Sequence, residues 1–478
     1  MVPDPAAAIA SSTAEPRLGP RTTVSRAASE LPGRNQPGAW WSLPILVLLS
    51  GLSLLDRQIL TLMVPSIKRD LGISDFQIGV LQGLVFAIFY SVAAVPIGWL
   101  VDRFPRRPII WLGVTVWGLC GVACGLANSF LGLFVARLGV GAGEAALSPA
   151  AFSMLADLFK PSRLALAISI LTIGSNLGNG LAVGLGGAIV GFSEKGGSLA
   201  LPVIGHLRSW QFVFLVTGLP SVVLAPLVFL IREPVRRGRT PGVRGPAISE
   251  TLRFMGANRR FFLSHFIGFG LMAVVGWGFT SWLPVYMNRA FGWSIGRISL
   301  PLALIIGIGP TLGTVASGWL ADHLFGRGQS DAHLRVGAGI ALGVAILGVI
   351  AFRVHDPIVF LILVTPIASS IALIATASAA LQIVSPSEMR GQISAIFLLV
   401  VTGFGLGVGP MLVGAVSDFV FGNEARLGDS LALVFGVLAP IAAVVLWLGR
   451  KSMRLAVSNA RPSQAFEPTE FPQLSPPG

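Results

Sequence analysis

Residues 76–101, FQIGVLQGLVFAIFYSVAAVPIGWLV, form an apolar run without a charged side chain. A helix needs roughly 20 apolar residues to cross a hydrocarbon core about 30 Å thick, and this run is longer. The first charged residues after this run are Asp102 and Arg103, at the end of the sequence GWLVDR at residues 98–103. The stretch predicts a membrane-spanning helix with a charged end. Because the run is continuous rather than alternating, it excludes a transmembrane β-barrel.

The composition favours a membrane protein for the chain as a whole. Of 478 residues, 53% are hydrophobic and 12% are charged, whereas a soluble domain carries about 25% charged residues. Apolar runs of sufficient length predict an all-α protein with twelve transmembrane helices in two six-helix bundles. The predicted spans lie near residues 41–64, 76–101, 108–127, 130–156, 164–191, 210–231, 262–287, 295–321, 336–352, 357–383, 391–416 and 430–449.

The formal charge of +13 follows from the predicted topology. An even number of spans puts both termini on one side, and the segments on that side contain 24 of the 34 Lys and Arg residues. The loops on the other side contain 8, while Arg57 and Arg137 lie within spans. Because positive charge accumulates on the cytoplasmic side, both termini are predicted to be cytoplasmic, in an inner or plasma membrane. This placement of the basic residues argues against nucleic-acid binding.

The densest basic segment divides the chain into two halves. Residues 232–260, rich in Arg, Gly and Pro, are predicted to be a cytoplasmic linker that contacts anionic lipid. Six-helix bundles are predicted at 40–231 and 261–450, and disordered cytoplasmic tails at 1–39 and 451–478. The N-terminal segment lacks the apolar region of a cleavable signal peptide. The two cysteines lie in one apolar run and predict neither a disulfide framework nor a metal site.

The sequence GWLVDR at residues 98–103 recurs as GWLADHLFGR at residues 318–327, at the same place in the second half. A chain of six plus six spans with this repeated element resembles the major facilitator superfamily over essentially its whole length. The resemblance implies two parallel repeats that enclose a cavity at the membrane midplane. Such a cavity opens alternately to each side of the membrane.

The repeated element also has a physical interpretation of its own. Gly98 and Gly318 permit close approach of helices. Asp102 and Asp322 fall at helix ends, where a carboxylate can face the positive N-terminus of another helix. We therefore expect an electrostatic latch between the halves in one conformation, the alternative being a solvated anchoring loop. The residues assigned to the predicted latch are Gly98, Asp102, Arg103, Arg106, Arg163, Asp322 and Arg390.

The first half carries a narrower resemblance. Helix 1 contains LDR at residues 55–57, helix 2 begins GVLQG at 79–83, and helix 4 reads RLGVGAGEAALSP at 137–149. Together these segments resemble the spinster branch, whose members transport lysolipids and sphingosine-1-phosphate-like amphiphiles. The glycines of residues 174–187 resemble the antiporter motif of drug exporters but lack its Gly-Pro step. The direction of transport therefore stays open.

Four charged residues are predicted at membrane depth: Asp56, Arg57, Arg137 and Glu144. Charges are costly there and usually face a cavity. Arg137 and Glu144 are seven residues apart and share one helix face, so Arg137 is the expected structural partner of Glu144. A carboxylate in a poorly solvated cavity can carry a proton. Proton coupling is therefore assigned first to Glu144 and second to Asp56.

The predicted substrate site combines these charges with aromatic residues of the second half. Arg57 is the expected head-group contact, because a guanidinium stays charged and binds anions bidentately. Arg137, Trp277 and Trp282 are the other residues assigned to the substrate. The alternative is a purely structural ion-pair network that holds helix 1 against helix 4.

The sequence thus predicts a secondary active transporter, not an enzyme, that moves a lysolipid or related amphipathic anion with proton coupling. The alternative is a proton-coupled transporter of a small organic anion or drug. The chain contains no H-E-x-x-H, G-x-S-x-G or P-loop sequence, which argues against a membrane enzyme and an ATP-driven pump. A receptor or scaffold would not need the repeated element. We expect substrate, protons and membrane lipids as partners, no cofactor or metal, and a monomer.

Overall fold

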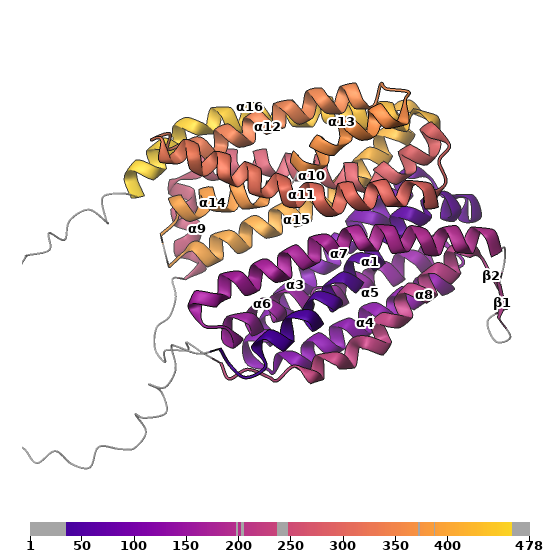
Figure 1. Cartoon of the computed structure of the whole chain (residues 1–478). Helices are drawn as coiled ribbons and strands as arrows, with labels where there is room; N and C mark the ends of the chain where they lie inside the picture. The colour runs from indigo at the N-terminus through magenta and orange to yellow at the C-terminus, as the bar shows by residue number, and fades with distance from the viewer. Residues whose placement is uncertain are drawn as a thin grey trace, which may run out of the picture.

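The computed structural model describes residues 35–196, 199–201, 205–236, 247–370, 373–386 and 388–460. Within these residues, twelve helical spans are long and apolar enough to cross a membrane, which confirms the predicted number. Figure 1 shows two helical bundles side by side, the N-half in indigo to magenta and the C-half in orange to yellow. The start of α1 and the end of α16 lie at the same end of the molecule, which we call the terminal face; the other end is the opposite face.

The predicted tail residues 1–34 and 461–478, and part of the predicted linker, lie outside the described residues.

The N-half extends from α1 to η4. The helices of the N-half are α1 Ala39–Leu71, α2 Asp75–Gly79, the π-helical turn η3 Val80–Leu84, α3 Val85–Arg103, α4 Arg106–Leu126, α5 Phe130–Glu144, α6 Leu147–Leu158, α7 Pro161–Gly196, α8 Ser209–Leu224 and the 3₁₀ helix η4 Ala225–Leu230. A two-stranded antiparallel hairpin between α7 and α8, β1 Leu199–Leu201 and β2 Gly205–Leu207, adds to the predicted all-α fold.

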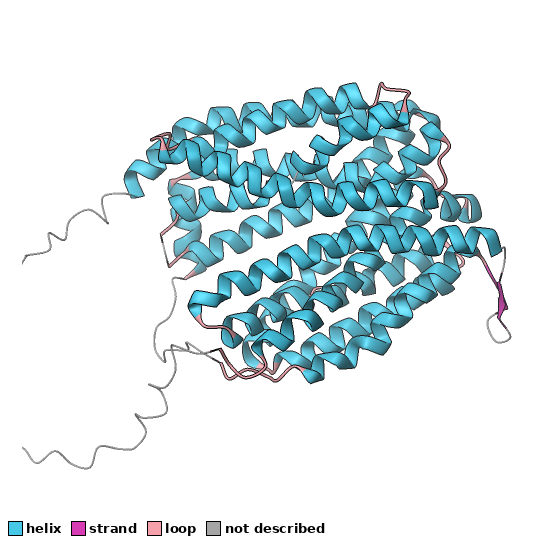
Figure 2. Cartoon of the chain, in the orientation of Figure 1, coloured by secondary structure: helices cyan, strands magenta, loops and turns pink. Residues whose placement is uncertain are grey.

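The C-half repeats this arrangement, and Figure 2 shows how fully helices account for both halves. Helix α9, Ile248–Ala257, precedes the C-half within the predicted linker. The helices of the C-half are α10 Arg259–Phe291, α11 Ile295–Gly326, α12 Ala332–Ala351, α13 Pro357–Ser370, α14 Ile374–Val384, α15 Arg390–Ala415, the π-helical turn η5 Val416–Phe421, the 3₁₀ helix η6 Glu424–Arg426 and α16 Leu427–Ala460.

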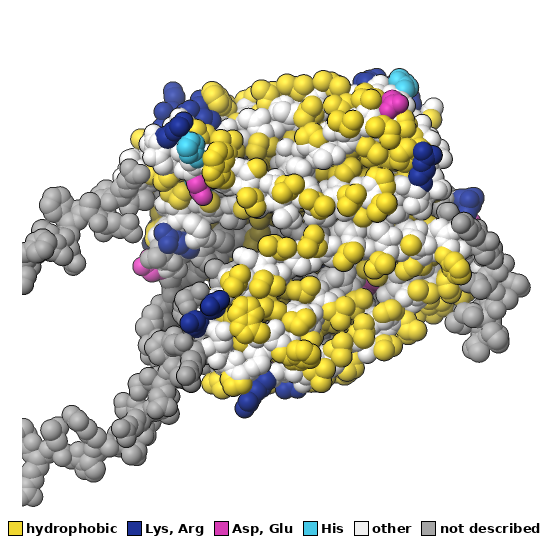
Figure 3. Space-filling view, in the orientation of Figure 1, with side chains coloured by type: hydrophobic (Ala, Val, Ile, Leu, Met, Phe, Trp, Pro, Cys, Tyr) yellow, Lys and Arg dark blue, Asp and Glu magenta, His cyan; other side chains and the backbone are white. Residues whose placement is uncertain are grey.

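The outer surface has the character expected of a protein in lipid. Figure 3 shows hydrophobic side chains over the middle of the molecule, while Lys, Arg, Asp and Glu gather toward its two ends. Large apolar side chains such as Val95, Leu448 and Trp319 are exposed by 72%, 72% and 65%. Exposure of this kind is tolerated where the surrounding solvent is hydrocarbon rather than water.

Several spans contain irregular backbone. The fourth predicted span is two helices, because α5 ends at Glu144 and α6 begins at Leu147. The second and eleventh spans each contain a π-helical turn, η3 and η5. Irregular backbone at membrane depth is tolerated where it is covered by protein or lines a cavity, and π-helical turns are frequent at functional sites.

Closely packed glycines join the two halves toward the opposite face. A Cβ atom added at Gly79 would lie 2.5 Å from the carbonyl oxygen of Pro410, and one at Gly83 would lie 2.5 Å from that of Leu406, so η3 packs directly on α15. Gly180 of α7 approaches Ala303 of α11 equally closely. The glycines of α7 that resemble an antiporter motif therefore include a packing seam between the halves.

Glycines near the terminal face behave differently. A Cβ atom added at Gly98, Gly318 or Gly391 would meet no atom within 4 Å. Among the described residues, the glycines toward the opposite face thus pack the halves together, whereas these three glycines at the terminal face make no such close approach. The close helix approach predicted for Gly98 and Gly318 is not made in this conformation.

Candidate functional site

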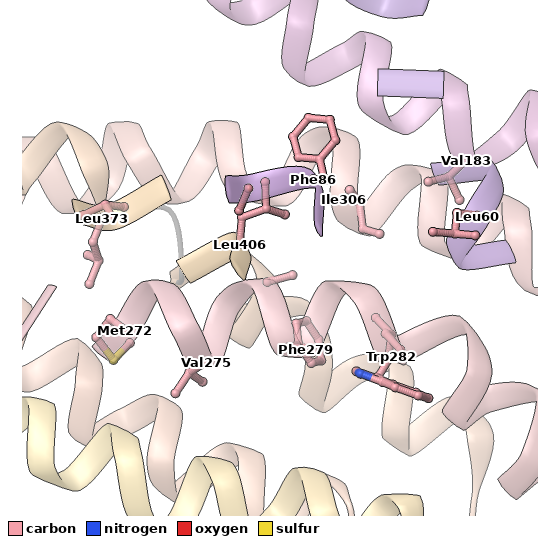
Figure 4. Close-up of a cluster of buried hydrophobic side chains, with 14 of the residues drawn as sticks. Leu60, Phe86, Val183, Met272, Val275, Phe279, Trp282, Ile306, Leu373 and Leu406 are labelled. Carbon is pink, nitrogen blue, oxygen red and sulfur yellow. The ribbon is translucent and has the colours of Figure 1, made fainter. Parts of the chain in front are cut away.

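Two adjoining cavities lie between the halves. The larger has a volume of about 200 Å³ and the smaller about 30 Å³. Gln58, Trp277 and Thr280 line both of them, so the cavities meet at these residues. Figure 4 labels Met272, Ile306 and Leu373, which line the larger cavity, and Phe86 and Leu406, which line the smaller.

The larger cavity is mostly apolar. Its polar residues are Gln58 and Asn179, whose side chains form a 2.7 Å hydrogen bond between α1 and α7, together with Thr280. The other lining residues are Phe269, Met272, Ala273, Gly276, Trp277, Ile306, Pro310, Ala368, Leu373, Ile374, Ala377, Phe397 and Val401. A lining of this kind favours hydrocarbon, because few polar groups lose contact with water when it is filled.

The smaller cavity contrasts with the larger one because it contains positive charge. Arg57 and Arg137 both line it, and the ring of Phe86 lies between them. The guanidinium carbon of Arg57 is 4.4 Å from the Phe86 ring centre, and that of Arg137 is 5.8 Å from it. The lining also includes Gln58, Thr61, Gln82, Trp277, Thr280, Ser281 and Leu406. We call the two adjoining cavities together the chamber. Its smaller part can therefore attract an anion.

Arg57 and Glu144 form the central ion pair. Glu144 Oε2 accepts from Arg57 Nη2 at 2.5 Å and from Arg57 Nε at 2.8 Å, and the hydroxyl of Ser53 donates to the same oxygen at 2.6 Å. Ser53 and Arg57 are four residues apart and therefore share one face of α1. The Glu144 side chain is fully buried, whereas 23% of the Arg57 side chain is exposed. The pair joins α1 to the end of α5.

Arg137 does not have the role that the sequence analysis expected. Its predicted partner was Glu144, but Arg57 occupies that carboxylate. Arg137 is 2% exposed, and its Nε has no hydrogen-bond partner among the described residues. The correct helix face was predicted, yet the reach of Arg57 from α1 decides the pairing. Arg137 is thus a buried cation at the edge of the smaller cavity.

Asp56 points away from both cavities. It is 5% exposed, and its Oδ2 would lie 3.9 Å from a Cβ atom added at Gly121 of α4. That oxygen has no hydrogen-bond partner in the described part of the chain. Trp117 and Ser221 are nearby, on α4 and α8. Asp56 and Arg57 therefore diverge, as expected for adjacent helical residues, and only Arg57 reaches the cavity.

The two tryptophans assigned to the substrate have different positions. Trp277 lines both cavities. Trp282 lines neither of them; it is fully buried, and its Nε1 donates to the carbonyl oxygen of Pro410 at 2.8 Å. Trp282 thus holds α10 against α15. Of these two tryptophans, only Trp277 can contact a molecule in the chamber.

An ion cluster joins the halves at the opposite face. We call Lys68, Asp75, Arg289 and Glu424 the opposite-face cluster; the first two belong to the N-half and the last two to the C-half. Asp75 is fully buried and accepts from Lys68 at 2.5 Å and from two nitrogens of Arg289 at 2.8 Å each. The hydroxyl of Ser417 adds a 2.8 Å bond. Asp75 is therefore the centre of the contact that closes this face.

Glu424 completes the cluster from the surface. It lies 2.7 Å from Lys68 and 3.2 Å from Arg289, with 57% of its side chain exposed. Nearby, the backbone N–H of Phe76 donates to Asp418 across the halves at 2.6 Å. The sequence analysis missed this cluster because charges at helix ends also occur in ordinary loops. The sequence does contain a usable signal. Lys68 and Asp75 carry opposite charges and flank a turn next to a span.

The predicted latch residues of the N-half contact their own half. Arg106 is 3% exposed and forms an ion pair with Asp157, and its backbone N–H donates to Glu233 at 2.9 Å. Arg103 lies over the ring of Trp99 at 4.0 Å. The backbone carbonyl of Asp102 accepts from Arg236, and Arg163 is exposed. These contacts fix the end of α3 against the start of α4 and the predicted linker.

The latch residues of the C-half are also bound locally. Asp322, with 79% of its side chain exposed, lies 3.7 Å from His333 of α12. Arg390 donates to the backbone carbonyl of Ser385 at 3.2 Å. In the conformation seen here, the described contacts of these residues stay within one half.

No group of three or more His, Cys, Asp or Glu that could hold a metal ion occurs within the residues that the structure describes.

Comparison with known proteins identifies the family. Residues 46–410 match the family model of the Major Facilitator Superfamily. The MFS-type efflux pump of Mycolicibacterium smegmatis is 30% identical over 424 residues, which cover 87% of this chain and 94% of the relative. Protein spinster of Drosophila melanogaster is 26% identical over 85% of this chain and 66% of its own length.

A solved structure extends the likeness to three dimensions. A bacterial homolog of the human lysosomal transporter spinster, in an inward-facing and unoccupied conformation, superposes with a TM-score of 0.74. The two chains are 25% identical, and the match covers 91% of this chain and 100% of the homolog. The members of this family are transporters rather than enzymes. The chain is a spinster-like member of the Major Facilitator Superfamily.

Proposed function

We propose that the protein is a secondary active transporter that moves a lysolipid or related amphipathic anion by alternating access, with proton coupling through Glu144. The observation that carries the proposal is the division of the chamber. An apolar cavity of about 200 Å³ adjoins a small cavity lined by Arg57 and Arg137. An amphiphile matches both parts, with its anionic group at the arginines and its hydrocarbon in the larger cavity.

Proton coupling follows from competition for Arg57. In the structure, Arg57 binds Glu144. A substrate anion that takes Arg57 leaves Glu144 as a buried carboxylate without its cation, which is costly unless a proton binds. Anion and proton therefore favour each other, and by linkage the preference is reciprocal. Asp56, which the cavities do not reach, is the second candidate for the proton, and Arg137 provides a permanent charge beside the pair.

The topology is part of the proposal. The excess of Lys and Arg on the terminal face supports a cytoplasmic location of both termini in a cell membrane. We propose that residues 40–231 and 261–450 act as the two moving bundles of a monomer, joined by a linker at 232–260. A tag at either terminus should then be accessible to protease only from the cytoplasm.

Alternating access requires a second conformation in which the terminal face is closed. The opposite-face cluster and the glycines of η3 hold the present conformation. We propose that Asp102, at the end of α3, helps to latch the terminal face in the other conformation through the N-terminus of α15. Gly98 and Gly318 would then supply the close approach that they lack here.

Asp102→Ala is therefore expected to shift the population toward the conformation seen here. A cysteine reporter at Ala273→Cys, in the larger cavity, should be labelled faster from the terminal face, because closure of that face loses one charged contact. Arg107→Ala, which removes a nearby charge that is outside the predicted latch and donates to the backbone carbonyl of Phe229, serves as the matched control. Unchanged labelling in Asp102→Ala would assign Asp102 to the anchoring loop instead.

A second function has one observation in its favour. The relative from Mycolicibacterium smegmatis, 30% identical, is described as an efflux pump, which supports a proton-coupled transporter of a small organic anion or drug. A small hydrophilic anion would need polar partners on both sides of the chamber, since unpaired polar groups cost several kcal/mol in a dry site. The C-half side of the larger cavity is apolar and aromatic, so the amphiphile remains the better match.

The two functions are separated by the response to chain length. For phosphate monoesters with one head group and increasing tails, affinity for the detergent-purified protein should rise about fourfold per methylene, because each buried CH₂ contributes ~0.8 kcal/mol. Arg57→Ala should weaken every member by a similar factor. Equal binding of short and long anions would favour the small-anion transporter.

A further inference from the structure

The side chain of Gln82 occupies an unusual place in the chamber. It belongs to the π-helical turn η3, which interrupts the second span, and it lines the smaller cavity. Gly79 and Gly83 on either side of it lie against the backbone of α15, so the turn has little freedom to move away. A π-helical turn of this kind is more often found at a functional site than elsewhere in a helix. The backbone therefore fixes Gln82 over the cavity.

The orientation of the Gln82 amide follows from its one hydrogen bond. Its Nε2 lies 3.4 Å from the backbone carbonyl oxygen of Ser281 in the C-half. A carbonyl can only accept, so the amide must present its NH₂ group there and its oxygen elsewhere. Gln82 is 6% exposed, and its Oε1 has no hydrogen-bond donor among the described residues. A buried acceptor without a donor is costly, and the residue that carries it lines the smaller cavity.

The same cavity contains an unpartnered donor. Arg137 is 2% exposed, and within the described residues its Nε also has no hydrogen-bond partner. Two residues that line the cavity thus carry unpartnered polar atoms, a cationic donor at Arg137 and a neutral acceptor at Gln82. The cavity's volume of about 30 Å³ has room for about two water-sized groups, such as one anionic oxygen and one hydroxyl group, and the rest of a head group would extend toward the adjoining larger cavity. An anionic group next to a neutral donor would satisfy both residues, whereas an ammonium group would be disfavoured beside two guanidinium groups.

We propose that Gln82 is a specificity-determining residue, whose Oε1 accepts a hydrogen bond from a hydroxyl group adjacent to the anionic group of the substrate. The inference rests on the proposed function and makes the substrate class narrower. The Gln82 side chain would then favour lysolipid anions with a free hydroxyl group near the phosphate over lysolipid anions in which that position is deoxygenated or blocked. A site with a buried acceptor rejects a ligand without the matching donor, because the acceptor then stays unpaired.

The test is a pair of ligands that differ by one oxygen atom. A 1-acylglycerol 3-phosphate has a free 2-hydroxyl, and its 2-deoxy analogue with the same acyl chain does not. Purified wild-type protein should bind the hydroxylated ligand about fivefold more tightly, the range expected for one hydrogen bond. Gln82→Leu and the closer isostere Gln82→Met should bind both ligands with equal affinity. Thr61→Val, which alters another polar side chain of the same cavity, should keep the preference.

The possible outcomes separate the inference from the function on which it rests. Loss of the preference in both Gln82 variants, with the deoxy ligand still bound, supports the inference. Equal binding of the two ligands by wild-type protein contradicts it, as expected if only water occupies the site next to Gln82. A preference that survives in Gln82→Met contradicts it as well and leaves Gln82 as a contact between η3 and α10. Failure of wild-type protein to bind either ligand would contradict the proposed function itself.

Discussion

Replacing Glu144 by Gln is expected to abolish the pH dependence of anion binding. In the wild-type protein, ionised Glu144 occupies Arg57 through two hydrogen bonds. Anion affinity should therefore rise as the pH falls, since protonation of Glu144 frees the guanidinium. Glutamine keeps the volume of the side chain but cannot ionise, so the variant should bind tightly at every pH. We expect a change of at least about tenfold between pH 8.5 and 5.5 in wild-type protein, equivalent to ~1.4 kcal/mol, and a flat profile in the variant.

The groups that face Glu144 make the control specific. They are Ser53 and Arg57 on α1 and Arg137 on its own helix α5, and the carboxyl of Asp56 on α1 also interacts electrostatically with Glu144. Asp157→Asn removes another paired carboxylate from the same observed span, Phe130–Leu158, where Asp157 binds Arg106 outside both cavities. That variant should lose stability while keeping the wild-type pH profile. If Glu144→Gln retains the full pH response, the proton must bind elsewhere, with Asp56 the next residue to replace by Asn.

Replacing Asp75 by Asn is expected to open the opposite face. The fully buried carboxylate holds Lys68 and Arg289 from different halves, and removing one partner of a buried ion pair is strongly destabilising, by roughly 3–5 kcal/mol. Because Lys68 and Arg289 are partly exposed and can recover water, we expect a smaller shift, of at least about tenfold, in the conformational equilibrium. Spin labels at Arg69→Cys and Arg426→Cys should report longer distances across this face.

Glu424→Gln provides the matched control for Asp75→Asn. Glu424 contacts the same Lys68 and Arg289, but 57% of its side chain is exposed. Exposed ion pairs contribute about 0–1 kcal/mol, so this variant should leave the distance distribution close to that of the wild type. Equal effects of the two substitutions would show that burial of Asp75 does not control the closure. Unchanged distances in both would remove the opposite-face cluster from the mechanism.

Local patterns of the sequence were sufficient for the fold. A span is a property of about twenty consecutive residues, so hydropathy alone predicts the twelve helices. The same reasoning placed Arg57, Arg137 and Glu144 inside the membrane, because an ionisable residue in an apolar run is conspicuous. The interruption after Glu144 was not predicted, although Glu144 itself ends α5 and Pro149, which lacks a backbone N–H, lies in the first turn of α6.

The sequence alone could not predict which side chains of different helices contact one another. Whether Arg57 or Arg137 binds Glu144 depends on the rotation of α1 about its axis, which the packing of all the neighbouring helices determines. Trp282 was assigned to the substrate on residue type alone, yet the carbonyl of Pro410 holds it in the core. Gln82 was noted only as part of the segment GVLQG at residues 79–83, and the sequence assigned it no role; its importance depends on the π-helical turn and on the unpaired oxygen.

The most direct test of the account is transport by the purified protein in proteoliposomes. A long-chain lysophosphatidate should cross the membrane faster when a pH gradient is imposed than when the pH is equal on both sides, and Arg57→Ala should eliminate the gradient-driven component. Short organic anions should show little gradient-driven transport. Transport that is insensitive to the gradient, or that favours short polar anions over the long-chain lipid, would contradict the proposal of a proton-coupled transporter of amphipathic anions.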